Sequence, residues 1–253
     1  PVQNIGAYGT EVAELLASVR AWDRAAGRTV HIPLSELRLA YRDSALKRSL
    51  TDPDVGAGRT WGPTGRWVVL SATFHVRQAS LSAPIAYRQL AGALGVDMGA
   101  RVDAREVREA VLALRRSKGM VLDADDHDTW SAGSFFTNPI LTRAAAAALP
   151  EDAPRFPVTD HTRVVAGVQD APVVDGLVKT SAAWLIDHAG FPKGFAAPGA
   201  SGRARLSTRH VLALTNRGGA TAADVAALRD TIVAGVRERF GITLVPEPVA
   251  VGW

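Results

Sequence analysis

The segment that constrains the fold most is residues 221–240, because it carries the full local pattern of an amphipathic helix. Thr221 is a preferred N-cap residue, and Asp224 stands three positions later, as in a capping box. Apolar residues recur at helical spacing, at Val225, Leu228, Ile232, Val236 and Phe240. Gly241 follows as the expected stop. This pattern predicts a long helix that packs its apolar stripe on a substantial core.

The remaining segments mix helical and extended patterns. The predicted helices are residues 103–118, 138–149 and 178–189. The predicted strands are residues 68–76, 211–215 and 242–251, with a hairpin connection at residues 25–28. In the first of these strands, the predicted buried face is Val68, Leu70, Ala72, Phe74 and Val76. Because strands and helices do not alternate strictly, we predict an α+β protein with two lobes, an antiparallel sheet with helices and a smaller α/β lobe.

Composition excludes several classes of site and partner. The 253 residues include no cysteine, which excludes disulfides, thiolate zinc sites and thiol catalysis. The net charge is +4, but Arg and Lys are scattered among Asp and Glu without a nucleic-acid-binding motif. No apolar run approaches the roughly 18 residues of a membrane span. The acidic stretch of residues 123–128 lacks the spacing of a calcium loop, so we expect a solvated loop there and no metal.

Three segments, far apart in the chain, together supply a cation, a hydroxyl and a carboxylate. They are Tyr41-Arg42-Asp43-Ser44, Gly133-Ser134-Phe135-Phe136-Thr137-Asn138-Pro139 and Leu244-Val245-Pro246-Glu247-Pro248. A serine hydroxyl is a very weak acid, so Ser134 can protonate only a strongly basic centre such as an enolate. Arg42 suits a developing enolate, and the flanking prolines hold Glu247 on a stiff backbone. The set suits a reaction that builds negative charge on carbon and then protonates it.

Each of these residues also has a structural interpretation. Glu247 fits a rigid surface turn at the end of a strand. Ser134 or Asn138 fits the N-cap of a helix. Arg42 fits an ion pair with Asp43, which is the commoner fate of such neighbours. The local sequence leaves these alternatives open.

Together these segments resemble the flavin-dependent UDP-N-acetylenolpyruvoylglucosamine reductases, in the longer type that carries a tyrosine in a substrate loop. The resemblance covers nearly the whole chain and rests on the order and spacing of its motifs. They are residues 1–9, Tyr41-Arg42-Asp43-Ser44 with Lys47, residues 133–139, Ala183-Trp184-Leu185-Ile186, residues 207–216 and residues 244–252. The sequence departs from the family pattern at Thr137, where Lys is common, at Val245, where an acid is usual, and at Ala45-Leu46. None of these positions carries a presumed catalytic group.

The resemblance implies the reduction of UDP-N-acetylglucosamine enolpyruvate to UDP-N-acetylmuramate in peptidoglycan precursor synthesis. In the family, NADPH reduces FAD, and the flavin then passes hydride to C3 of the enolpyruvyl group, leaving an enolate at C2. By this resemblance Arg42 and Glu247 stabilise the enolate, and Ser134 protonates C2. The implied enzyme is a cytoplasmic monomer that takes a UDP-sugar substrate, without a nucleic-acid or membrane partner.

The resemblance also assigns binding residues and lobes. The implied substrate contacts are Tyr87, Lys118, Asn138, Lys193 and His210. The implied cofactor contacts are Gln3, Asn4, Gly6, Ala7, Gly9 and Arg42. The implied flavin-side lobe is residues 1–118 with residues 241–253, and the implied substrate-binding lobe is residues 119–240.

The start of the chain departs from the family pattern. The family has an N-terminal lobe whose glycine-rich turns hold the FAD diphosphate, and this chain begins after the corresponding segment. We therefore expect this polypeptide alone to bind FAD poorly or not at all and to turn over little. One alternative is a non-catalytic nucleotide-sugar-binding remnant that cannot load FAD. A second is a serine hydrolase that uses Ser134 with a paired histidine, although the segment is not a nucleophile elbow.

Overall fold

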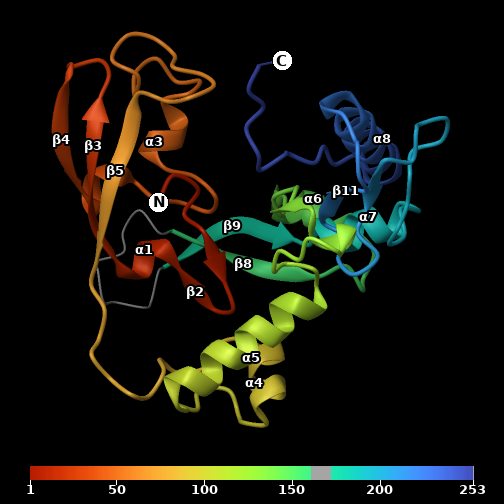
Figure 1. The fold of residues 1–253 in the computed structure, drawn as a ribbon, viewed down its shortest axis with the longest axis horizontal. Coiled ribbons are helices and arrows are strands. Elements are labelled where there is room, and N and C mark those ends of the chain that lie inside the picture. The colour runs from red at the N-terminus through yellow and green to blue at the C-terminus, as the bar shows by residue number, and fades with distance from the viewer. Residues whose placement is uncertain (161–171, 253) are drawn as a thin grey trace. The chain divides into compact units, whose positions relative to one another are not determined.

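The computed structural model describes residues 1–160 and 172–252. The chain divides into two compact units. Unit 1 comprises Pro1–Val107, Thr159–Val174 and Val249–Trp253, and unit 2 comprises Arg108–Val158 and Asp175–Pro248. Both units contain helices and antiparallel strands (Figure 1), which confirms the predicted α+β class. The division into a flavin-side lobe and a substrate-binding lobe is a functional assignment and stays a prediction.

The sheet of unit 1 is built on a β-hairpin. Its strands are β3 (Leu16–Asp23), β4 (Arg28–Pro33) and β5 (Trp67–Phe74). They lie in the order β4-β3-β5 and pair antiparallel (Figure 1). In the turn, the Asp23 carboxylate accepts hydrogen bonds from the amides of Ala25 and Ala26 (2.9 and 3.3 Å), and Gly27 has a φ of 62°. The predicted hairpin connection is confirmed.

The strand predicted at residues 68–76 is present as β5, but its predicted buried face is wrong except at Ala72. The exposed residues are Val68, Leu70 and Phe74. Those that pack against the core of unit 1 are Trp67, Val69 and Ala72. The pairing with β3 shifts register between Arg20 and Ala21. Since successive side chains point to opposite faces of a strand, this irregularity changes which residues face the core.

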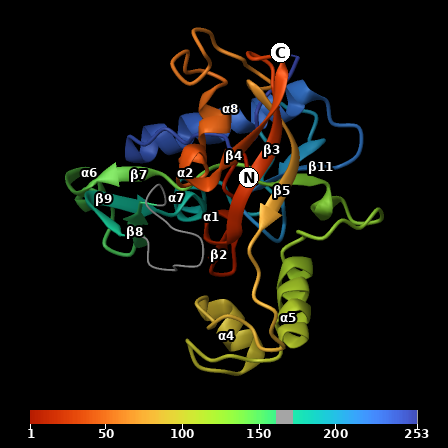
Figure 2. The same cartoon turned by 90° about the vertical axis from the view of Figure 1, so that its left-hand side faces the viewer.

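Short elements complete unit 1. They are β1 (Gly6–Ala7), β2 (Thr10–Glu11), α1 (Val12–Leu15), α2 (Leu34–Leu37), α3 (Ala45–Arg48) and α4 (Arg88–Leu94). Helix α2 lies against β3 and β4 (Figure 2). Ser44 caps α3, because its hydroxyl accepts a hydrogen bond from the Lys47 amide (3.0 Å). The Tyr41-Arg42-Asp43-Ser44 segment therefore leads directly into a helix.

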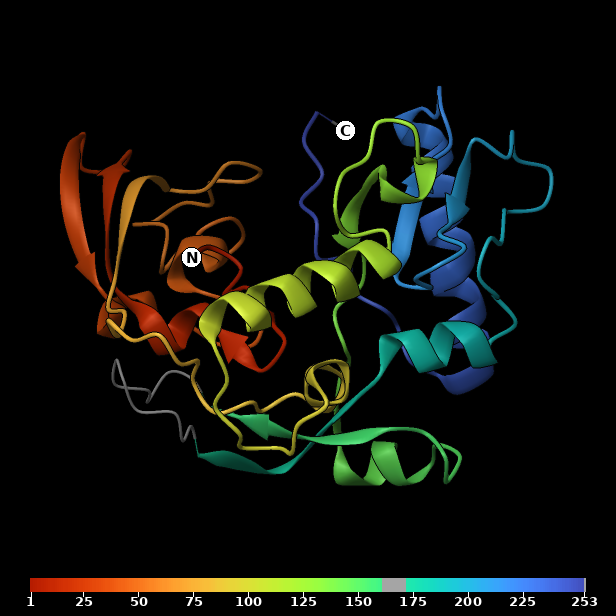
Figure 3. The ribbon, with the colours of Figure 1, turned by 60° about the horizontal axis from the view of Figure 1, so that its bottom comes forward.

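The strands of the second half of the chain form two further sheets. One contains β6 (Ser131–Ser134), β10 (Ala204–Leu206) and β11 (Ala213–Asn216), in the order β10-β11-β6. The other contains β7 (Ile140–Thr142), β8 (Arg155–Thr159) and β9 (Val173–Thr180), in the order β7-β9-β8. The helices are α5 (Ala104–Ser117), the 3₁₀ turn η1 (His127–Thr129), α6 (Arg143–Ala147), α7 (Ala182–His188) and α8 (Ala222–Phe240). Helices α7 and α8 pack against each other in unit 2 (Figure 3).

Helix α8 confirms the strongest sequence prediction. The Thr221 hydroxyl accepts a hydrogen bond from the Asp224 amide (3.2 Å), and the Asp224 carboxylate accepts one from the Thr221 amide (2.8 Å). The bond from the Thr221 amide, then those from the Ser201 and Thr221 hydroxyls (both 2.7 Å), lower the pKa of Asp224 to about 2. Gly241 ends the helix with a φ of 69°. The fully buried residues of the stripe are Leu228, Ile232 and Val236.

In the described part of the chain, no helix combines the length and the apolar character that crossing a membrane requires.

Other predicted elements differ in extent. Residues 138–149 form strand β7 and then the short helix α6, and residues 178–189 form the end of β9 and then α7. Thr142 and Ser181 cap these two helices, which explains why they begin late. Residues 242–251 form only an isolated bridge to Phe136, because Pro246 and Pro248 lack the amide hydrogens that a continuous ladder needs. Strand β11 begins at Ala213 rather than at residue 211.

Gly235 lies inside α8, and its surroundings decide the effect of a substitution there. We expect Gly235→Ala to lower the free energy of unfolding by about 1 kcal/mol, because its added Cβ would lie 2.4 Å from Cζ of the buried Phe191 ring. Helix propensity alone predicts a gain of about 1 kcal/mol instead. The matched control is Gly92→Ala in α4, where no described atom lies within 4 Å of the added Cβ. Urea denaturation should show destabilisation of the first variant and stabilisation of the second; stabilisation of both would contradict the predicted clash.

Candidate active site

Ser134 lies at the end of strand β6, in unit 2. It pairs with Ala213 on β11, and the amide of Phe135 donates a hydrogen bond to the Leu212 carbonyl (2.7 Å). Ser134 therefore stands on a regular strand and not at the start of a helix. Its interpretation as an N-cap is wrong.

The side chain of His210 lies next to Ser134. The Ser134 Oγ is 3.3 Å from the His210 Nε2. The backbone of His210 is held on both sides, because its amide donates to the Ser207 hydroxyl (3.2 Å) and its carbonyl accepts from the Ala213 amide (2.9 Å). Ser207 itself is fully buried. The serine–imidazole contact is thus supported by an ordered turn.

Two lysines act electrostatically on His210. Burial lowers the pKa of His210, and the charges of Lys118 and then Lys193 lower this pKa further. Burial also lowers the pKa of Lys118. Lys118 follows α5, and Lys193 follows α7, so separate elements bring both charges to the same site. At neutral pH the imidazole is therefore uncharged, and it lies in cationic surroundings beside the Ser134 hydroxyl.

Asp128 anchors the turn that carries His210. Its carboxylate accepts hydrogen bonds from the amide and the hydroxyl of Thr208 (2.8 and 2.6 Å) and from the Arg217 guanidinium (3.1 Å). The predicted solvated loop is therefore wrong at this residue, which is only 6% exposed. An added Cβ at Gly119 would lie 2.8 Å from the Asp128 carbonyl oxygen, so this glycine lets the chain after Lys118 pass close by.

Sequence reasoning missed Asp128 because its partners are distant in the chain. Thr208 lies 80 residues away and Arg217 lies 89 residues away. The acidic stretch shows no local pattern that separates Asp128 from the exposed Asp125.

Backbone hydrogen bonds join the Glu247 segment to the Ser134 segment. Its amide donates to the carbonyl of Phe135 (2.8 Å), and the Thr137 amide donates to the Val245 carbonyl (3.0 Å). The two segments thus run side by side within unit 2, and Glu247 is half-buried. Two predicted catalytic residues, Ser134 and Glu247, therefore come from neighbouring backbone segments.

Asn138 has a structural task in unit 2. Its side-chain carbonyl accepts a hydrogen bond from the Ala182 amide (3.0 Å), at the first residue of α7. This contact satisfies one of the free amides of a helix start. The predicted substrate contact by Asn138 stays a prediction, together with those by Lys118, Lys193 and His210.

Arg42 belongs to unit 1, where it is held in a strained conformation. Its φ is 52°, which a residue with a Cβ rarely adopts. Its guanidinium donates to the backbone carbonyls of Asn4 and Gly6 (both 2.9 Å). Asp43 forms its ion pair with Arg48. The interpretation of Arg42 and Asp43 as a structural ion pair is therefore wrong.

The predicted cofactor segment, residues 3–9, is fastened to unit 1 by side chains. The Asn4 amide group donates to Glu11 Oε2 and to the Ala40 carbonyl (both 3.0 Å), and its oxygen accepts from the Ala13 amide (2.9 Å). Lys47 holds Gln3 by a hydrogen bond of 3.0 Å. The protein engages the Asn4 backbone as well, because its amide donates to the Pro1 carbonyl (3.2 Å) and its carbonyl accepts from Arg42 (2.9 Å).

The shape of this segment suits a cofactor that main-chain atoms hold. Asn4, Tyr8 and Gly9 have φ values of 41°, 54° and 87°, which turn the chain tightly. An added Cβ at Gly9 would lie 3.2 Å from Cβ of Ala86. The Tyr8 ring meets the ring of the predicted substrate residue Tyr87 edge-on, with centroids 5.5 Å apart. Gly6 and Ala7 form β1, so the predicted flavin contacts lie on one ordered strand-and-turn segment.

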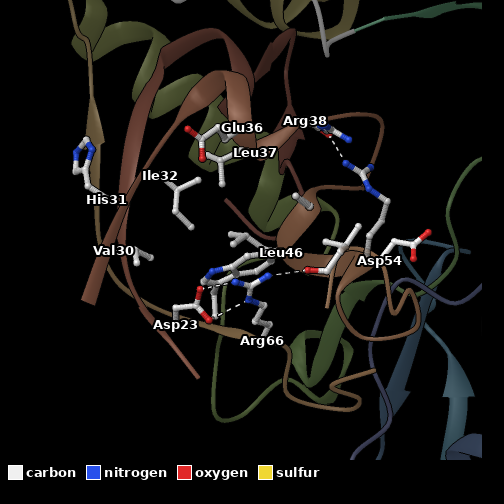
Figure 4. Close-up of a pocket in the computed structure, with 14 residues that line it drawn as sticks. Asp23, Val30, His31, Ile32, Glu36, Leu37, Arg38, Leu46, Asp54 and Arg66 are labelled. Atoms are coloured by element: carbon white, nitrogen blue, oxygen red, sulfur yellow. Dashed lines mark hydrogen bonds and ion pairs between the residues drawn. The ribbon is translucent and has the colours of Figure 1, made fainter. Parts of the chain in front are cut away.

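Unit 1 also contains a hollow of about 570 Å³ beside its sheet (Figure 4). Its apolar lining residues include Val30, Ile32, Leu37, Leu46 and Trp67. At its edge, two N–H groups of Arg66 donate to the Asp23 carboxylate (2.9 and 2.6 Å), and these bonds are the main reason that the pKa of Asp23 is lowered. The residues that line the hollow include none of the predicted site residues, so we do not assign it to the candidate active site.

The predicted site residues thus form two groups, each described within its own unit. In unit 2, Ser134 and His210 are in contact, Lys118 and Lys193 act on His210, and the backbone of Glu247 binds the residue after Ser134. In unit 1, Arg42 is bonded to the predicted cofactor segment, and Tyr87 contacts Tyr8. The convergence of Arg42 with Ser134 and Glu247 stays a prediction.

Comparison with known proteins identifies the family. Relatives named UDP-N-acetylenolpyruvoylglucosamine reductase are 51% identical in Streptomyces avermitilis, 49% in Mycolicibacterium gilvum and 52% in Nocardia farcinica, each over 100% of this chain. The matches cover 63%, 64% and 60% of those proteins, so the chain spans about three fifths of their length. A crystal structure of UDP-N-acetylenolpyruvylglucosamine reductase from Thermus caldophilus aligns over 97% of this chain and 56% of that one, with 18% identity and a TM-score of 0.46. A family model described as UDP-N-acetylenolpyruvoylglucosamine reductase, C-terminal domain, matches residues 125–251, about half of the chain, and the chain belongs to this family.

Proposed function

We propose that this chain carries the substrate-protonating part of a UDP-N-acetylenolpyruvoylglucosamine reductase, which reduces UDP-N-acetylglucosamine enolpyruvate to UDP-N-acetylmuramate. Family membership supports the reaction class. The observation that carries the proposal is the Ser134 hydroxyl in contact with a neutral His210 whose neighbours are two lysines. Such surroundings favour a serine that loses its proton, and an enolate is basic enough to take it.

The reaction needs a hydride source, which in this proposal is FAD reduced by NADPH. When bound and reduced, FAD would supply hydride to C3 of the enolpyruvyl group. Main-chain atoms of Gln3, Gly6, Ala7 and Gly9 would hold it, and Asn4 would shape the turn that presents them. The tight turns at Asn4 and Gly9 support this assignment. Arg42 supports the same segment by its bonds to the Asn4 and Gly6 carbonyls.

Ser134 provides the proton that completes the reduction. After hydride addition, the substrate carries an enolate, with negative charge shared between its carboxylate and C2. A C–H bond forms at C2 while the O–H bond of Ser134 breaks, and the electron pair of that bond stays on Oγ. The charges of Lys118 and Lys193 favour this oxyanion, and a proton from solvent then restores the hydroxyl.

Arg42 and Glu247 polarise the substrate in this proposal. A guanidinium placed beside the enolpyruvyl carboxylate stabilises charge that grows as the enolate forms. Glu247 projects from a backbone stiffened by Pro246 and Pro248, which limits its movement. Tyr87, Lys118, Asn138 and Lys193 are the proposed contacts for the rest of the UDP-sugar, with Lys118 near the diphosphate.

The serine hydrolase alternative has one observation in its favour and one against it. His210 is the paired histidine that a nucleophilic Ser134 requires. However, a general base must accept a proton, and burial together with the two lysines makes His210 less basic instead of more basic. A fluorophosphonate probe distinguishes the two, since a hydrolase would be labelled at Ser134 and the proposed reductase would not.

The direct test supplies the purified chain with FAD, NADPH and UDP-N-acetylglucosamine enolpyruvate. Because we expect this polypeptide alone to hold FAD weakly, we expect only slow NADPH oxidation, which depends on saturating FAD and on the enolpyruvyl substrate and gives UDP-N-acetylmuramate as the product. A chain that binds the substrate in calorimetry but forms no product at saturating FAD would instead support the nucleotide-sugar-binding remnant. A chain that neither binds nor reduces the substrate would overturn the proposal.

A further inference from the structure

We propose that His210 is a positioning residue for Ser134, and that its imidazole donates the Nε2 hydrogen to the serine Oγ. This inference rests on the proposed function and deepens it. The family resemblance assigns His210 to substrate binding, whereas the geometry points to a hydrogen bond from its imidazole to the reacting Ser134. The proposal concerns one hydrogen bond, its direction and its consequence for the proton that Ser134 gives up.

The distance between the two side chains permits a hydrogen bond in either direction. Ser134 Oγ and His210 Nε2 are 3.3 Å apart. If the serine donates, its proton is held by the imidazole and is unavailable to the substrate. If the imidazole donates, the serine keeps its own hydrogen free, since a hydroxyl has one donor and two acceptor positions. Only the second arrangement suits a proton donor.

Burial and the charges around His210 keep its imidazole neutral, and the tautomer with its hydrogen on Nε2 gives the second arrangement. The charged groups that act on the imidazole are Lys118, beyond the end of α5, and Lys193, beyond the end of α7. Both are positive, and with burial they keep His210 in its neutral form. A neutral imidazole that donates through Nε2 has a bare Nδ1, which is a suitable acceptor for a cationic donor or for water.

The backbone around His210 is ordered enough to hold such a bond. The Ser207 hydroxyl accepts hydrogen bonds from the amides of Arg209 and His210 (3.0 and 3.2 Å). The neighbouring Thr208 is fastened to buried Asp128 by two hydrogen bonds. The imidazole therefore projects from a turn that several hydrogen bonds hold in place, as a positioning residue requires.

The consequence for catalysis concerns the oxyanion that forms on Ser134 as it gives up its proton. When Ser134 transfers its proton to C2, the Nε2–H of His210 already points at the developing oxyanion. A fixed donor of this kind stabilises the charged state more than the neutral hydroxyl and needs no rearrangement. The imidazole keeps its proton throughout, so proton balance is unchanged: one proton leaves Ser134 for carbon and one returns from solvent.

The deciding experiment is ¹⁵N NMR of the histidine rings in this chain, with the His210 signals assigned from their loss in His210→Gln. We expect a protonated Nε2 and a bare Nδ1 at neutral pH, and a titration midpoint below the ordinary value of about 6.5. Lys118→Met should move this midpoint upward, and Lys193→Met should move it less. An unprotonated Nε2 at neutral pH would overturn the proposal. A His210 titration midpoint that is the same in the wild type and in both lysine variants would also overturn it.

Kinetics give a second, independent readout. His210→Phe should lower kcat about a hundredfold with little change in KM, because it removes a donor to an oxyanion. His210→Gln offers a side-chain N–H in its place and should recover most of kcat, and His188→Gln, on the exposed end of α7, should leave kcat unchanged. A raised KM with unchanged kcat in His210→Phe would mean substrate binding only and would overturn the proposal. Failure of the proposed reductase function appears as an inactive wild type, and the NMR result still decides the direction of the hydrogen bond.

Discussion

Replacing Ser134 with alanine is expected to lower the turnover of UDP-N-acetylglucosamine enolpyruvate by about two to four orders of magnitude, the usual effect of removing a positioned acid. The hydroxyl is the proposed source of the proton for C2, and water cannot match a donor that is already in place. KM should change little, since the proton moves only in the transition state. The backbone of β6 should remain intact, because its pairing with β11 uses main-chain atoms.

The measurement is steady-state NADPH oxidation with saturating FAD, together with quantification of UDP-N-acetylmuramate. Ser71→Ala is the control, because it removes the same hydroxyl from an exposed position on β5. Turnover of Ser134→Ala within about threefold of the wild type would remove Ser134 from the mechanism. Loss of turnover in both variants would indicate a general structural effect.

Replacing Asp128 with alanine is expected to lower the free energy of unfolding of unit 2 by about 3–5 kcal/mol, the usual effect of breaking a buried charged pair. The side chain of Asp128 is 9% exposed and that of Arg217 is 21% exposed. Alanine would leave the Arg217 guanidinium and the Thr208 amide and hydroxyl without this acceptor. The turn that carries His210 should loosen as a result.

Acid should weaken the same anchor. Burial raises the pKa of Asp128, but the bonds from Thr208 and Ser207 and the charge of Arg217 outweigh it, so the pKa is lowered overall. A lowered carboxyl pKa contributes stability above the unfolded value of about 3.9, and this contribution is lost as the pH falls through the folded value. Asp128→Asn should therefore show a weaker loss of stability in acid than the wild type.

Amide hydrogen exchange is the suitable measurement for these variants, because it reports unit 2 separately from unit 1. We expect faster exchange in β6 and β11 of Asp128→Ala. Asp125→Ala is the matched control, since Asp125 is exposed in the same acidic stretch, and its effect should stay within about 0.5 kcal/mol. Equal effects of the two substitutions would contradict the anchoring role of Asp128.

The sequence by itself determined the elements whose signals are local. The capping box of Thr221, the apolar stripe and Gly241 specify α8, since residues close together in the sequence form the capping box and the glycine stop. The predicted helix over residues 103–118 is likewise present as α5, and the turn at residues 25–28 connects β3 and β4. The order and spacing of the motifs also identified the family before any geometry was considered.

The tertiary structure decided whatever depends on partners distant in the chain. It selected the buried face of β5 through a register shift against β3. It placed His210 beside Ser134 across 76 residues and buried Asp128 against Thr208 across 80 residues. Local periodicity carries no information about such contacts, because strand register and long-range hydrogen bonds are set by the packing of whole elements against one another.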